Sequence, residues 1–336
     1  MKRMKTVYAV ITMIVLMLIA TGCSSNGDGD IGVVEINPDL LFMTIIPQGT
    51  FRMGDTLDYT EWGSDQKPIH TVQLTYDYYI GIWEVTVREF MTFLNRAGVR
   101  EDGYYHGKMI IDIEAETCEY YYAGDAFRLK HPGKANHPVI EVTWWGAVEY
   151  CNWLSREMGI NEAYNTTSGS LINSVGESTT DITEVEGYRL PTEAEWEHAA
   201  RGAQNDYATD DDFAFSGGNT LNDVGWYSFK SGATAYPLGD DGKGTLERKS
   251  KAPNEIGLYD MSGNVWEWCN DYYQSNYYYE SLVRNPTGPT DTPDDHRVIR
   301  GGSWFNTENF CRVASRAYMF ENFGSFSVGF RVAKTK

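Results

Sequence analysis

Positive charge is scarce in this sequence. Its 336 residues include 28 Lys and Arg but 47 Asp and Glu, so the formal net charge is −19, and the acidic residues are spread along the chain. Such a surface repels nucleic acid and anionic lipid, so no nucleic-acid partner is expected. Aromatic residues are plentiful instead, with 23 Tyr and 10 Trp. That composition is typical of a large packed core and not of a disordered tail.

Cysteine is also sparse, and no Cys-x-x-C pair or Cys/His spacing indicates a zinc site. Besides Cys23 near the N-terminus, the cysteines are Cys118, Cys151, Cys269 and Cys311. Outside the cytoplasm these four can pair in three ways or stay reduced. The spacing does not choose among these states.

The N-terminus predicts export. Basic residues at positions 2, 3 and 5 precede an apolar run over residues 7–20, which is too short for a membrane-spanning helix and is typical of a cleaved leader. The segment LIATGC at 18–23 resembles a bacterial lipobox, with Ala20 where leucine is more usual. The resemblance implies that Cys23 is acylated and becomes the new N-terminus. An ordinary signal peptide with a chance cysteine is the alternative.

Three segments are therefore expected. Residues 1–22 form a lipoprotein signal peptide, residues 23–40 a small, polar and acidic tether, and residues 41–335 the folded domain. The expected location is the cell envelope, outside the cytoplasm, with the chain held to a membrane by its lipid anchor. Ser24 after the acylated cysteine is compatible with the outer membrane.

Short strands and few helices are predicted in the folded part. Helices are expected after the threonine caps Thr86, Thr143 and Thr192, and Gly202 ends the third. In that third helix, Thr192 and Glu195 form a Thr-x-x-Glu capping box. Two polar insertions are long for connections and are expected at the surface with some β structure. The insertions are residues 101–134 and 164–186, and the expected strands are residues 43–46, 50–54, 70–74 and 78–83.

Seven motifs occur in order along the predicted domain. They are FRMG at 51–54, EVT at 84–86, HPV at 137–139, YRLPTEAEWE at 188–197, GLYDMSGNVWEW at 257–268, RGGSW at 300–304 and GFR at 329–331. Together they resemble the formylglycine-generating enzyme, or sulfatase-modifying factor, family over essentially the whole domain. The resemblance implies one α+β domain with that family's variant of the C-type-lectin-like fold, which has little regular secondary structure.

The tryptophan-rich motif implies a structural calcium ion. In the family, calcium is held around this block, and the matching positions supply carboxylates from Asp260 and Glu267 and backbone carbonyls from Gly263 and Val265. Hard oxygen ligands from a tight turn suit calcium. The alternative is core architecture, with one acid capping a helix and the other solvated. A second family calcium site falls in residues 217–245, where the ligands do not align.

The catalytic motif of the family is incomplete here. Family enzymes oxidise a substrate cysteine with copper held by two thiolates, in the pattern Arg-Gly-Gly-Ser-aromatic-x-Cys-x-x-x-x-Cys. Ser303 is kept, Asn306 replaces the first cysteine, and Cys311 stands at the second. A single thiol among amides and carboxylates is a poor copper(I) site, so copper is not expected. If the chain is enzymatic, Ser303 and Cys311 are its catalytic candidates.

A binding function is therefore favoured, with a protein, small-molecule or glycan ligand at the envelope. Related diversified lectin-fold lipoproteins vary in the segment corresponding to residues 304–326, which is rich in residues suited to adaptable binding surfaces. A formylglycine-generating oxidase and a structural component of an envelope complex are the alternatives. The candidate binding residues are Trp304, Phe305, Asn306, Asn309, Phe310, Tyr318, Phe320, Asn322, Phe323 and Phe326.

Overall fold

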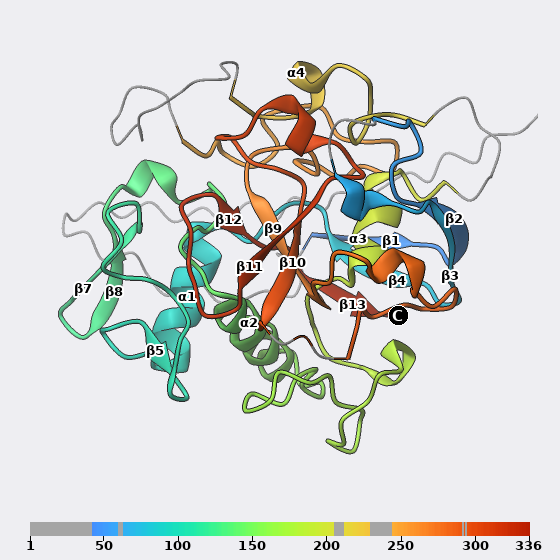
Figure 1. Ribbon diagram of the computed structural model, residues 1–336. Helices are drawn as coiled ribbons and strands as arrows, with labels where there is room; N and C mark the ends of the chain where they lie inside the picture. The colour runs from blue at the N-terminus through green and yellow to red at the C-terminus, as the bar shows by residue number, and fades with distance from the viewer. Residues whose placement is uncertain (1–41, 60–62, 205–211, 229–243, 291, 293) are drawn as a thin grey trace, which may run out of the picture. The chain divides into compact units, whose positions relative to one another are not determined.

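Short strands carry this fold, with a few helices packed against them (Figure 1). The computed structural model describes residues 42–59, 63–204, 212–228, 244–290, 292 and 294–336. The predicted signal peptide, Cys23 and the tether lie outside these residues and stay predictions. In the described part, no helix is long and apolar enough to cross a membrane.

A four-stranded sheet lies at the centre, in the order β11-β10-β9-β12 (Figure 1). The strand β12 is parallel to β9, and the other pairs are antiparallel. The side chains of β9 are buried up to its last residue, as expected for a central strand. The bounds are Trp266–Tyr272 for β9, His296–Arg300 for β10, Arg316–Phe320 for β11 and Val328–Gly329 for β12.

A second sheet joins the first and last described strands of the chain. Its order is β1-β4-β13, with bounds Met43–Ile46, Tyr78–Gly81 and Ala333–Thr335. Hairpins complete the β structure, and two of them lie in the insertion at 101–134, as predicted. The hairpins are β2 (Gly49–Met53) with β3 (His70–Leu74), β5 (Tyr104–Tyr105) with β6 (Lys108–Met109), and β7 (Tyr120–Ala123) with β8 (Ala126–Leu129).

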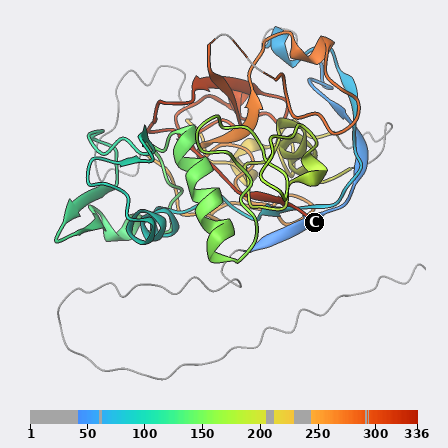
Figure 2. The same ribbon diagram turned by 90° about the horizontal axis from the view of Figure 1, so that it is seen from below.

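All three predicted helix caps are confirmed. Thr86, Thr143 and Thr192 each accept a backbone N–H from the first turn, and Glu195 completes the predicted capping box. Helix α1 lies between α2 and the β7–β8 hairpin (Figure 2). The helices are α1 (Val87–Ala97), α2 (Trp144–Glu157), α3 (Glu193–Ala200) and α4 (Leu221–Val224). Short 3-10 turns occupy Ser64–Gln66, Pro132–Lys134, Ile182–Glu184, Tyr277–Tyr279 and Glu308–Cys311.

Buried arginines connect the sequence motifs inside the core. Arg300 of the RGGSW motif donates to Glu193 at 3.0 Å and to Glu197 at 2.5 Å, both on α3. Arg189 donates to both oxygens of Glu195, at 2.6 and 2.7 Å. These side chains are almost fully buried. A buried charge is tolerated only when it is paired and hydrogen-bonded, so the pairs fix how the motifs meet. The predicted α+β fold class, with few helices and many short strands, is confirmed.

Candidate functional site

The turn before β9 is built by residues in the left-handed region. Asp260, Gly263 and Asn264 have φ values of 60°, 93° and 62°. A Cβ on Gly263 would lie 2.3 Å from the carbonyl oxygen of Trp226, so only glycine allows this approach. Asn264 then accepts the Leu246 N–H at 2.9 Å through its side-chain oxygen. The turn is thus packed on both sides by backbone from distant segments.

Glu267 is held by an arginine from the C-terminal motif. The Nε of Arg331 donates to one carboxylate oxygen at 2.6 Å, and its Nη2 donates to the other at 2.7 Å. The indole of Trp196 adds a bond at 2.8 Å. Trp266 and Trp268 are both buried, and Glu267 between them is buried as well. A carboxylate has about four lone-pair positions, so these three donors leave Glu267 one at most.

Two neighbouring carboxylates have oxygens without a hydrogen-bond partner. These are Oδ1 of Asp260 and Oε2 of Glu84, and both residues are buried. Burial raises the pKa of Asp260 to about 6. Burial, followed by the repulsion of Asp260, raises the pKa of Glu84 well above its usual range. Sequence reasoning missed Glu84, although it stands in the EVT motif, because no local pattern connects it to Asp260.

This pair tests the predicted calcium site. Unpartnered buried carboxylate oxygens fit a hard cation, and Asp260 and Glu84 offer one each. No three His, Cys, Asp or Glu side chains converge as a metal-binding group within the described ranges. A calcium ion there would therefore also need the carbonyls of Gly263 and Val265. The second predicted region, 217–245, lies partly outside the described residues.

Ser303 contacts both positions of the incomplete catalytic motif, and its backbone N–H donates to the sulfur of Cys311. Its hydroxyl donates to the side-chain oxygen of Asn306 at 2.6 Å. The thiol of Cys311 is fully buried, and a Cβ on Gly302 would lie 2.7 Å from its sulfur. Burial raises the pKa of Cys311 to about 12. At neutral pH this thiol is protonated, and the thiolate is the form that attacks and binds metal.

The other described cysteines are also buried, and none forms a disulfide within the described part. Burial raises the pKa of Cys118 to about 11 and raises the pKa values of Cys151 and Cys269 as well. Of the states left open by the sequence, disulfide-bonded or reduced, the structure therefore has these cysteines as free thiols. They serve as small core side chains.

The candidate binding residues other than Asn306 fall into three groups. Trp304, Phe305 and Phe326 are partly buried and pack edge to face, with centroids 5.4 to 5.8 Å apart. Tyr318 and Phe320 on β11 are 50% and 47% exposed. Beyond β11, Phe323 is 58% exposed, and Asn322 is exposed as well. Asn309 and the half-exposed Phe310 belong to the 3-10 turn that carries Cys311.

His296, which sequence reasoning missed, extends the exposed group. Its ring lies 4.6 Å from that of Tyr318 and 4.1 Å from that of Phe320. Tyr273 stacks on Tyr318 at 4.4 Å. No periodicity in the sequence reveals this group, because the contacts form between paired strands.

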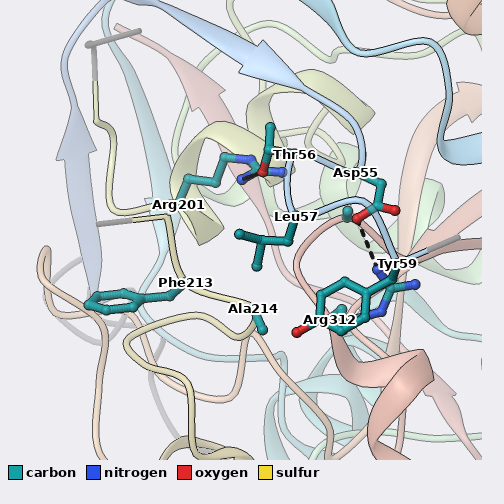
Figure 3. Close-up of a pocket in the computed structure, with 9 residues that line it drawn as sticks. Asp55, Thr56, Leu57, Tyr59, Arg201, Phe213, Ala214 and Arg312 are labelled. Carbon is teal, nitrogen blue, oxygen red and sulfur yellow. Dashed lines mark hydrogen bonds and ion pairs between the residues drawn. The ribbon is translucent and has the colours of Figure 1, made fainter. Parts of the chain in front are cut away.

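A small pocket, with a cavity volume of only about 10 Å³, opens beside the β2–β3 hairpin (Figure 3). Its cations are already paired: Arg312 contacts Asp55 at 3.3 Å, and Arg201 contacts Asp212 at 2.5 Å. The ring of Tyr59 lies beside the Arg312 guanidinium, 4.7 Å from it. The two arginines therefore present no uncompensated charge to a ligand.

Comparisons with known proteins agree with the fold and the motifs. Residues 34–336 match the family model described as sulfatase-modifying factor enzyme 1-like domain. The formylglycine-generating enzyme of Thermomonospora curvata is 31% identical over 87% of this chain and 92% of its own. Chaperone protein LppX of Paenibacillus barcinonensis is 34% identical over 59% of this chain and 70% of its own. The solved structure of Treponema denticola variable protein 1 has a TM-score of 0.60 and 27% identity, covering 88% of this chain and 95% of its own.

Proposed function

Because the chain belongs to the sulfatase-modifying factor enzyme 1-like domain family, we propose that it is a binding member that does not oxidise cysteine. One observation carries the proposal: Asn306 replaces the first thiol, and the remaining thiol of Cys311 is buried with a pKa of about 12. Copper(I) prefers two soft thiolate ligands. The motif offers one protonated thiol instead.

The exposed aromatic residues support a ligand-binding role. Tyr318, Phe320 and Phe323 present large apolar surfaces to solvent next to polar Asn322. Such residues give contact area at low entropic cost. The likeness to a protein named as variable supports a binding surface at this segment that differs in sequence among relatives. A relative named as a chaperone favours a protein ligand.

The proposed location is the cell envelope. The apolar leader and the lipobox-like segment ending at Cys23 support a lipid anchor outside the cytoplasm, in the outer membrane. A tether would hold the domain near the membrane surface. A ligand fixed to the same surface would then be present at high effective concentration.

We also propose calcium as a structural ion near the turn at Asp260. The ion would be held by Asp260, Glu84 and the carbonyls of Gly263 and Val265, with Glu267 contributing through its remaining lone pair. Bound there, calcium would coordinate the two buried oxygens that have no hydrogen-bond partner. Its role would be to fix the turn before β9.

The test is an aldehyde assay. The full chain is incubated with copper and a Cys-x-Pro-x-Arg peptide, and the products are analysed by mass spectrometry, with an active formylglycine-generating enzyme as the positive control. No conversion is expected. A formylglycine oxidase is the second candidate, favoured by the 31% identity to such an enzyme, and a clear aldehyde signal would establish it.

A further inference from the structure

The strand β11 leaves one edge of the central sheet open (Figure 1). The Glu321 N–H donates to the Asp295 carbonyl at 3.1 Å, and β11 pairs antiparallel with β10 in the same register. Hydrogen-bonded and non-hydrogen-bonded pairs alternate in such a ladder. The backbone groups of Tyr318 and Phe320 therefore point away from β10.

These outward groups have little to bind. The Phe320 carbonyl accepts the Phe323 N–H at 3.1 Å. Among the residues that the structure describes, the N–H and carbonyl of Tyr318 and the N–H of Phe320 have no backbone partner beyond β11. An open edge with unpaired groups is a template for another strand.

The edge lacks the features that usually block such pairing. Proteins protect edges with lysine, proline or charged side chains. Residues 317–326 contain no Lys, Arg or Pro, and the charged residues Glu321 and Arg316 are buried in pairs with Arg297 and Glu193. Instead, Tyr318 and Phe320 stand exposed and are held in place by Tyr273 and His296. The edge is ordered, aromatic and accessible.

The charges around the edge select the partner. Asp294 and Asp295 are exposed at one end of the β10–β11 pair, where Lys108 is close enough to interact with Asp295 and leaves Asp294 as the excess charge. At the other end, Asp65 accepts the Tyr273 hydroxyl at 2.9 Å, and its carbonyl accepts from Arg316. Acidic residues next to aromatic faces attract Lys and Arg, which also bind the rings through cation–π contacts. A second copy of this chain carries the same charge of −19 and is repelled.

We propose that β11 binds an extended basic segment of a partner protein, which adds to the sheet as a fifth strand. This inference rests on the proposed binding function and names the partner's chemistry. Main-chain hydrogen bonds to Tyr318 and Phe320 supply affinity. The rings of these two residues and the carboxylates of Asp294 and Asp295 select a partner segment in which apolar and basic side chains alternate.

The test uses the full chain and two labelled nonapeptides, one alternating valine with lysine and one alternating valine with glutamate. Fluorescence anisotropy measures binding, and hydrogen exchange reports the amides of Tyr318 and Phe320. The lysine peptide is expected to bind at least tenfold more tightly and to slow exchange at both amides. Equal binding of both peptides, no binding of the lysine peptide, or unchanged exchange would overturn the inference. Protection that appears without peptide and grows with protein concentration would assign the edge to a second copy instead.

Matched variants separate backbone from side chain. Tyr318→Ala removes the ring and keeps the outward N–H, whereas Tyr318→Pro removes both without touching the bonds to β10. The proline variant is expected to bind about tenfold more weakly than the alanine variant. Equal affinities of the two variants would contradict strand addition.

A second variant, Asp295→Asn, tests the role of charge without the risk that a proline at position 318 disturbs folding. Asparagine tolerates the φ of 48° that Asp295 adopts. This variant should weaken binding of the lysine peptide about threefold, and unchanged affinity would refute the role of charge. Tyr121→Ala, on the separate β7–β8 hairpin, is the control that should bind normally. The aldehyde assay judges the proposed function independently of this edge.

Discussion

Cys311 should be almost inert to iodoacetamide in the native protein. Burial raises the pKa of its thiol from 9.0 to about 12. Each pKa unit corresponds to 1.36 kcal/mol, so forming the thiolate costs about 4 kcal/mol more than at an ordinary cysteine. At pH 8 the thiolate fraction falls from about 10% to about 0.01%, and alkylation should slow about a thousandfold.

The assay compares alkylation of native and urea-unfolded chain at pH 8, with the modified peptides quantified by mass spectrometry. Cys118 is an internal reference, because its pKa is raised only to about 11. It should react about ten times faster than Cys311 if the thiolate fraction sets the rate. Native Cys311 reacting within tenfold of its unfolded rate would refute the reasoning, and with it the argument that this thiol cannot serve a copper centre.

Four further predictions test the site and the scaffold. Asn306→Cys should confer copper(I) binding in competition with a chelator, because it places a second thiol beside Ser303, whose backbone N–H already bonds the Cys311 thiol; no gain would contradict this geometry. Glu267→Gln should cost about 3 to 5 kcal/mol in urea unfolding, since it leaves a buried guanidinium unpaired; a loss below about 1 kcal/mol would contradict that pairing. Calcium at a hundredfold excess over Kd should add about 2.7 kcal/mol of stability to the wild type and none to Asp260→Asn. Burial lowers the pKa of His137 to about 4, so between about pH 6.5 and 4 the unfolded chain binds a proton that the folded chain does not. The free energy of unfolding should therefore fall by about 1–2 kcal/mol as the pH drops through that range, and His137→Gln should flatten the decline.

Local signals in the sequence predicted the parts of the fold that local physics decides. The caps at Thr86, Thr143 and Thr192 are set by residues within one turn, so they were confirmed. The seven ordered motifs gave the family. Pairings across the chain were not visible: Glu84 and Asp260 are 176 positions apart, and nothing local indicates that their carboxylates share one buried region. The open edge of β11 also depends on strand order, which no single segment encodes.

The positions that carry the family resemblance and those that carry the proposed function lie in different environments. Arg300 meets α3, Arg331 meets Glu267, and Arg189 meets Glu195, all inside the core. Removing one member of such a pair strands a buried charge, so these motifs hold the scaffold whatever the protein does.

Asn306 and the exposed aromatic residues Tyr318, Phe320 and Phe323 are not needed for this pairing. They are partly or half exposed, and within the described chain they belong to no buried ion pair. Exposed positions away from such features usually change stability by less than about 0.5 kcal/mol. A chain of this family can therefore lose its first catalytic thiol and gain an aromatic edge at little cost to folding. For this fold, the motifs establish the scaffold, and the proposed binding function is argued from residues 303–326.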